Sequence, residues 1–214
     1  RDFERNFAKW AGEIRKIGTA EELNKVISDR FRPAREELSA RFDDAMRRLT
    51  GDALQQYRLR YVLGKLSQDV DQQAYGETQR TKWLSRYTGK DFEIEHIFPQ
   101  NPREDTQEEF GEYYDEEITQ RLGNLVLVER SINASLGNQP YSAKRKIYQQ
   151  SQLLLTRALS EKPKVGSNTK IDIAVKELET FDTWDEDAVL RRQSLLASMA
   201  RRIWDIPSPS SDPY

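Results

Sequence analysis

The residue best suited to chemistry is His96, which is the only histidine in the chain. Glu95 precedes it directly, and two asparagines, Asn124 and Asn133, follow at a distance. An imidazole with a pKa of about 6.5 can take a proton from water near neutral pH, and carboxylate and amide oxygens are ligands that suit Mg²⁺ or Mn²⁺. Hydrolysis of a phosphodiester needs both, a base for the water and a hard cation for the charge on phosphate. A lone histidine is more often a surface or internally bonded residue, so the prediction depends on the elements around it.

Two short strands are expected to carry these residues. Polar and apolar residues alternate from Asp91 to Ile97, which indicates a half-buried strand that Pro99 ends. The apolar run Leu125 to Val128 predicts a second strand, introduced by Gly123 and Asn124. Neighbouring residues of a regular strand point to opposite faces, so Glu95 and His96 could reach one phosphate only if the strand becomes irregular there.

The segments next to these strands are predicted to be less regular. The acidic stretch from Glu104 to Glu117 is expected to form a solvated loop and a short helix. Residues 133–140 are interpreted as an irregular turn, after which Ser142 is predicted to cap a helix. The expected local order is therefore strand, loop, strand, turn and helix.

The rest of the chain indicates amphipathic helices. The first helix is expected to carry an apolar stripe that either faces the core or packs on an upstream domain, at spacings of four and three residues: Phe3, Phe7, Trp10, Ile14 and Ile17. Thr19 has the form of a capping box for a second helix, and Pro33 suits the first turn of a third, with Leu38 and Met46 inward. A central helix over residues 52–74 is predicted to be apolar on two faces, one with Leu59, Leu63, Leu66 and Val70 and the other with Leu54, Tyr57 and Tyr61. A linker is expected over residues 162–170, and a last helix from Trp184 to Trp204 is predicted to bury Val189, Leu196, Met199 and Ile203.

Composition narrows the class of protein. Apolar residues make up 36% and charged residues 33% of the 214 residues, which favours a mainly α fold with solvated helix faces over a buried parallel sheet. There is no cysteine, which excludes disulfides and cysteine-zinc sites, and no apolar run approaches the roughly 20 residues of a membrane span. We therefore expect a cytoplasmic protein without a membrane partner. The net charge of −2 leaves room for a local basic groove.

Several of these motifs resemble one known family. Glu95 to Gln100, Arg121 to Leu127, Asn133 and the run from Asn138 to Lys144 closely resemble the HNH domain at the C-terminus of GmrSD-type modification-dependent restriction proteins, which include SspE-like phage-defence nucleases. The last helix, with Arg191 and Arg192, is also similar to that family. The resemblance extends over roughly residues 52–204. It implies a ββα-metal (HNH, His-Me finger) motif embedded in the helical domain.

The resemblance also implies roles for individual residues. His96 would be the general base, and Glu95 and Asn133 would bind the metal, Mg²⁺ or Mn²⁺. Asn124 would act with them by holding the loop that carries His96. The RNA-guided CRISPR nuclease HNH domain is similar, with an acidic residue before its histidine and two asparagines nine positions apart, as here. Contacts to DNA phosphates are expected from Lys144, Arg145 and Arg121.

Two positions depart from the family pattern. Glu95 stands where many HNH proteins have Asp, and Asn133 stands where others have His. Asn138 is a possible substitute for Asn133 as a ligand.

These points predict a metal-dependent DNA endonuclease domain of a bacterial anti-phage restriction protein, with nicking as the expected form of cleavage. Residues 1–50 would form a helical segment that connects to an upstream NTPase domain sensing modified DNA, residues 51–205 the nuclease domain, and residues 206–214 a disordered tail. Two alternatives stay open, a catalytically silent helical docking module and a DNA-binding module without catalysis.

Overall fold

The structure is a computed structural model that describes residues 2–111 and 114–206, with side chains from Glu4 onward. The predicted tail of residues 206–214 lies, apart from Ile206, outside the described residues. The chain divides into two compact units, one formed by residues 1–44 and 205–214 and the other by residues 45–204. Helices dominate both units, so the predicted mainly α class is confirmed. No helix in the described parts of the chain is long and apolar enough to cross a membrane.

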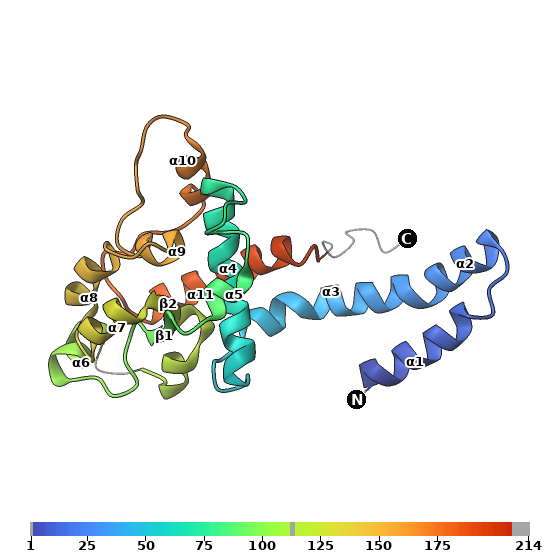
Figure 1. Cartoon of the computed structure of the whole chain (residues 1–214). Helices are drawn as coiled ribbons and strands as arrows, with labels where there is room; N and C mark the ends of the chain where they lie inside the picture. Colours follow the sequence, from blue (N-terminus) through green and yellow to red (C-terminus); the bar gives the residue numbers. More distant parts are fainter. Residues whose placement is uncertain (1, 112–113, 207–214) are drawn as a thin grey trace. The chain divides into compact units, whose positions relative to one another are not determined.

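The first unit is a pair of helical arms (Figure 1). It contains α1 (Asp2–Ile14), α2 (Ala20–Val26), a π-helical turn (Ile27–Phe31) and most of α3 (Arg32–Arg47). The predicted capping box of Thr19 is confirmed, since its side chain accepts from the backbone N–H of Glu22 and the Glu22 carboxylate accepts from that of Thr19.

The apolar stripe predicted on the first helix is largely not buried. Phe7 is 47% exposed and Ile14 is 41% exposed, while Trp10 packs on Phe31 with ring centroids 5.0 Å apart. The prediction that these residues face a core is therefore wrong for Phe7 and Ile14, and Leu38 of α3 is likewise exposed. A unit of this size encloses too little volume to cover the apolar faces of all its helices. The side chain of Phe3 lies outside the described residues.

The second unit is built around one antiparallel hairpin. Strand β1 (Phe92–His96) pairs with β2 (Leu125–Glu129) in a register that sets Phe92 opposite Glu129 and His96 opposite Leu125. Both predicted strands are confirmed. The residues between them contain α6 (Glu104–Phe110) and two short 3₁₀ helices, Glu116–Gln120 and Leu122–Asn124.

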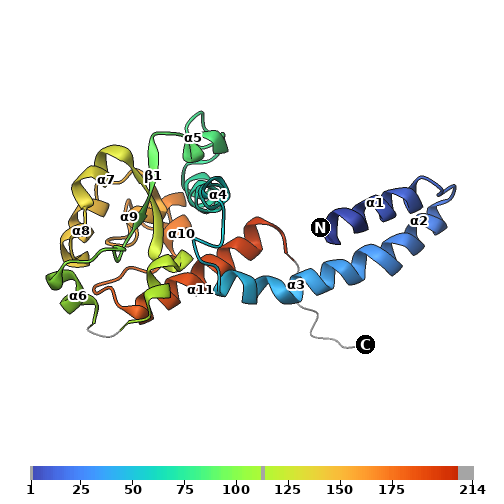
Figure 2. The same cartoon turned by 90° about the horizontal axis from the view of Figure 1, so that it is seen from below.

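Helices cover the hairpin on two sides. Figures 1 and 2 both show α7 (Arg130–Leu136) and α8 (Tyr141–Tyr148) on one side of it and α4 (Gln56–Tyr75) on the other. Helix α7 follows β2 without a break and contacts both strands. The prediction of an irregular turn from Asn133 is wrong, because Asn133 lies within α7 and the chain turns only at Gly137, whose φ is +50°.

The remaining helices complete this unit. They are α5 (Leu84–Thr88), α9 (Leu154–Arg157), α10 (Lys170–Val175) and α11 (Glu186–Ile203). Helix α4 buries Leu59, Leu63, Leu66 and Val70 as predicted, and α11 buries Val189, Leu196 and Met199. The second apolar face predicted for α4 is wrong, since Tyr57 is 64% and Tyr61 is 43% exposed. A tyrosine can keep its hydroxyl in water while its ring lies on the surface.

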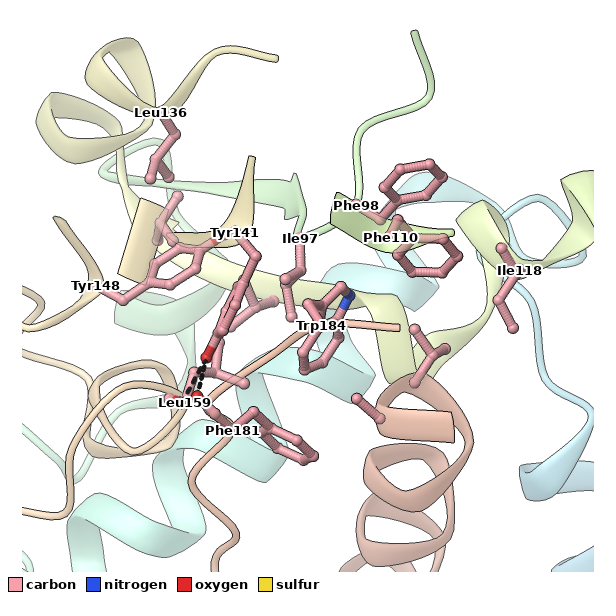
Figure 3. Packing of buried hydrophobic residues seen from close by; sticks show 14 residues of the cluster. Ile97, Phe98, Phe110, Ile118, Leu136, Tyr141, Tyr148, Leu159, Phe181 and Trp184 are labelled. Atoms are coloured by element: carbon pink, nitrogen blue, oxygen red, sulfur yellow. Dashed lines mark hydrogen bonds between the residues drawn. The ribbon is translucent and has the colours of Figure 1, made fainter. Parts of the chain in front are cut away.

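The core beneath the hairpin is aromatic. Figure 3 shows Trp184 among Ile97, Tyr141 and Phe181, with the Tyr141 hydroxyl donating to the backbone carbonyls of Leu159 and Phe181. Phe98 stacks on Phe110, with ring centroids 3.9 Å apart. This core lies directly under the residues that follow His96, so it fixes the end of β1.

Candidate active site

Asn124 joins the end of β1 to the start of β2. Its side chain is fully buried and makes four hydrogen bonds. The amide oxygen accepts from the backbone N–H of Phe98 at 2.8 Å and from the indole N–H of Trp184 at 3.0 Å. The amide nitrogen donates to the carbonyls of Phe98 at 2.8 Å and Thr119 at 2.9 Å. The backbone N–H and carbonyl of Phe98, two residues after His96, are therefore both hydrogen-bonded to the Asn124 side chain.

Helix α11 holds the segment around Asn124 from the other side. The buried guanidinium of Arg192 donates to the carbonyls of Gly123 at 2.6 Å and Leu125 at 2.8 Å, and burial lowers the pKa of Arg192 to about 10. The side chain of Gln193 accepts from the N–H of Gly123. A Cβ at position 123 would collide with the carbonyl of Val189, so this close approach requires glycine.

His96 ends β1 and remains in regular register opposite Leu125. The irregularity predicted at Glu95 and His96 is not found there; the backbone departs from pairing at residues 97 and 98, where Asn124 takes over the hydrogen bonds. Glu95 contacts α8 through Lys144, whereas the imidazole of His96 lies against the Gln120 side chain. A phosphate that meets both residues would therefore lie at the end of the strand.

The surroundings of the His96 imidazole favour its neutral form. Burial lowers the pKa of His96, the charge of Lys144 lowers it further, and the contact with Gln120 opposes the shift. The Nε2 atom is enclosed and has no hydrogen-bond partner among the described residues. A neutral ring with an unpartnered nitrogen has the form that a proton acceptor needs.

Glu95 forms a buried ion pair with Lys144. The ammonium lies 2.5 Å from Oε1 of Glu95, and it also donates to the carbonyls of His96 at 2.8 Å and Ile97 at 3.2 Å. The Lys144 side chain is fully buried, and that of Glu95 is 12% exposed. Burial raises the pKa of Glu95 and lowers the pKa of Lys144, and each partner opposes the shift of the other.

The phosphate contact predicted for Lys144 is not supported by this geometry. An ammonium has three donors, and all three are used by acceptors inside the protein. Lys144 instead ties α8 to Glu95 and to the backbone that follows it.

Asn133 reaches the hairpin from α7. Its Nδ2 donates to Oε2 of Glu93 at 2.6 Å, and Arg130 lies 3.4 Å from Oε1 of the same carboxylate. The Oδ1 atom of Asn133 is buried and has no hydrogen-bond partner among the described residues. Glu93 was not predicted as a site residue, although its alternation with Glu95 on a strand places both on one face.

The other predicted site residues lie elsewhere. Arg121 pairs with Glu117 at 2.7 Å and donates to the carbonyl of Arg47, and Arg145 pairs with Asp182 at 2.8 Å. Asn138 is exposed after the end of α7. The structure thus brings together Glu95, His96 and Lys144 with the Asn124 segment, and it adds Asn133 and Glu93 on the face of Glu95.

The donor atoms fit a hard divalent cation. No group of three or more His, Asp or Glu side chains that could hold a metal gathers within residues 2–111 and 114–206. The unpartnered Asn133 Oδ1 and the Glu95 carboxylate are oxygen donors of the kind that Mg²⁺ takes, and Mg²⁺ usually keeps several waters and needs one or two carboxylates. A metal held here would depend on water and phosphate oxygens for its other ligands.

Comparison with known families gives the class of this protein. Residues 36–199 match the family described as GmrSD restriction endonucleases, C-terminal domain. The match extends over most of the chain, so this protein belongs to that family, and the class of activity that the family implies is nuclease. No curated protein matches the chain. The predicted family is confirmed.

Proposed function

We propose that this chain is a metal-dependent DNA endonuclease of the HNH, or ββα-metal, kind, and that it nicks DNA as part of a bacterial anti-phage restriction protein. The observation that carries the proposal is the state of His96. Burial lowers the pKa of His96, its Nε2 has no hydrogen-bond partner among the described residues, and it stands beside Glu95 on a hairpin whose second strand runs directly into α7. The family supplies the class of reaction, and these residues supply a mechanism.

His96 would act as the general base. Nε2 accepts a proton from water, and the resulting hydroxide attacks phosphorus as the bond to the 3′ oxygen breaks. The leaving 3′ oxygen takes a proton from solvent, which gives a 3′-hydroxyl and a 5′-phosphate. The lowered pKa of His96 keeps the ring able to accept this proton near neutral pH.

Glu95 and Asn133 would hold Mg²⁺ or Mn²⁺ through a carboxylate oxygen and the unpartnered Oδ1. When bound, the cation would neutralise charge on the phosphate and on the departing oxygen. Asn124 would act through the backbone, because its bonds to residue 98 keep the strand end in one shape.

Contacts to the DNA backbone are proposed for Arg121 and Arg145. Their side chains are 21% and 32% exposed and each already pairs with a carboxylate that is itself more exposed. Such pairs contribute little and can be exchanged for phosphate. Recognition of modified DNA would lie in an upstream NTPase domain of the same polypeptide, which would act in the cytoplasm.

The test is cleavage of supercoiled plasmid by the purified protein with Mg²⁺ or Mn²⁺. We expect conversion to open-circular DNA, no conversion with EDTA, and at least a hundredfold loss in His96→Ala, as is usual for removal of a general base. Added imidazole should restore part of the activity of His96→Ala, since it replaces the missing base.

Asn101→Ala is the matched control, because it alters an exposed asparagine to which no role in the site is assigned. It should cleave like the unaltered protein. Equal cleavage by His96→Ala would exclude His96 as the base. Salt-dependent DNA binding without any cleavage would instead favour the DNA-binding module, and neither binding nor cleavage would favour the docking module.

A further inference from the structure

Glu93 is fixed between two residues of α7. Its Oε2 accepts from the Asn133 amide nitrogen at 2.6 Å, and its Oε1 lies 3.4 Å from Nε of Arg130. Both oxygens are therefore already engaged by protein groups. This makes Glu93 a poor direct ligand for a metal, even though it lies on the same face of β1 as Glu95.

The contact with Glu93 decides which way the Asn133 amide faces. An ionised carboxylate can only accept hydrogen bonds, so an amide that contacts it must present its NH₂ group. The Asn133 Oδ1 then has to point away from Glu93, and in the structure it is buried without a partner in the described residues. Leaving a buried carbonyl oxygen unpaired is unfavourable, so a cation at this atom would satisfy a group that the fold leaves without a partner.

We infer that Glu93 is a positioning residue that orients the Asn133 amide with its oxygen toward the divalent cation. This inference rests on the proposed function, since it takes Asn133 as a metal ligand. Glu93 touches neither substrate nor metal and acts only through Asn133.

The decisive variant is Glu93→Gln, which keeps the shape of the side chain but can present either a donor or an acceptor to Asn133. The amide of Asn133 is then free to turn over and offer its nitrogen instead. Disturbing a group that orients a metal ligand typically weakens metal affinity by about 10- to 100-fold. We expect a loss of this size for Mn²⁺, measured as free Mn²⁺ by electron paramagnetic resonance on the full chain without DNA.

Loss of one negative charge near the metal could by itself weaken binding, so the effect has to be traced to Asn133. We therefore compare Glu93→Gln in two backgrounds, unaltered and Asn133→Ala. A positioning role predicts the tenfold or greater loss in the first background and less than a twofold loss in the second. Glu108→Gln on the exposed face of α6 removes the same charge and should leave the Mn²⁺ affinity unchanged.

Glu93→Asp keeps the charge and the acceptor, and it should bind Mn²⁺ more tightly than Glu93→Gln. An equal loss in both backgrounds, or no loss in either, would overturn the inference while leaving the metal site intact. Absence of Mn²⁺ binding by the unaltered protein would overturn the proposed metal site as well. Cleavage lost in His96→Ala tests the base separately, so the two failures can be told apart.

Discussion

Asn124 and Asn133 are the same amino acid nine positions apart, and they are used in opposite ways. Every polar atom of the Asn124 side chain is bonded, twice each, within the core. The Asn133 nitrogen donates to Glu93, while its oxygen is buried and has no partner in the part of the chain that the structure describes, and the same holds for Nε2 of His96. Evolution normally removes unpaired buried polar atoms, because each costs free energy.

The difference separates two kinds of residue in one site. Asn124 is a structural group whose removal should be felt mainly in folding. His96 and Asn133 each carry a buried polar atom without a hydrogen-bond partner among the described residues. Their removal should mainly reduce cation binding and the rate of cleavage. The variants below test that division, beginning with the largest expected change in stability.

Asn124→Ala should destabilise the protein most. It leaves the buried N–H groups of Phe98 and Trp184 and two buried carbonyls without their partners. At about 1 to 3 kcal/mol for each unsatisfied group, and with partial relaxation, we expect the free energy of unfolding to fall by roughly 5 kcal/mol. Urea denaturation followed by tryptophan fluorescence measures this.

Asn133→Ala is the comparison and should lose less than about 1.5 kcal/mol, near the net value of one hydrogen bond. Equal losses in the two variants would remove the distinction between them.

Lys144→Met should be the next most damaging change. It leaves Glu95 as an unpaired carboxylate that is only 12% exposed, and breaking a buried pair costs about 3 to 5 kcal/mol. The double variant Glu95→Gln with Lys144→Met removes both charges and should recover most of the stability. If Lys144 instead contacts DNA phosphate, Lys144→Met would leave stability unchanged and reduce the salt dependence of DNA binding.

Asp71 lies outside the site. Its carboxyl should make the free energy of unfolding depend on pH, and its substitution should leave cleavage unaltered. Its buried carboxylate accepts from the Tyr87 hydroxyl at 3.0 Å and the Leu154 N–H at 3.2 Å, yet burial raises the pKa of Asp71 from 3.8 to about 6. A raised pKa means that folding favours the protonated form. The stabilisation is full below about pH 4 and is lost as pH rises through 6. At about 1.4 kcal/mol for each pH unit, the loss is on the order of 3 kcal/mol at most.

Asp71→Asn should abolish that step in a series of urea denaturations between pH 4 and pH 7. The amide keeps an acceptor for Leu154 and the shape of the side chain, so the fold is retained. A step of unchanged size in Asp71→Asn would assign the pH dependence to another group.

The two strands could be predicted because their signals are local. Alternation before Pro99 and the run Leu125 to Val128 each lie within one element, and both strands were found within one or two residues of the expected ends. Helix α7 was missed because serine, asparagine and glycine indicate a turn when they are taken alone. Packing of Leu136 in the core overrides that weak preference.

The contacts within the site could not be predicted, because they join residues far apart in the sequence. Lys144 is 49 positions from Glu95, and Asn133 is 40 positions from Glu93. Lysine in a basic run normally indicates a solvated helix face, and only the packing of α8 against the hairpin turns this one inward. The exposure of the apolar stripe on α1 could not be predicted either. Residue spacing predicts that a helix has an apolar face, but it does not predict what covers that face.

Because His96 is the only imidazole in the chain, it is also a built-in spectroscopic probe. In a protein labelled with ¹⁵N and freed of any histidine tag, every imidazole signal of the nuclear magnetic resonance spectrum comes from His96. These signals can therefore be used, without assignment by mutagenesis, to follow the tautomer and protonation of His96. They can also show when a cation or a nucleotide binds at the end of β1. The proposed general base can therefore be observed before any DNA is added.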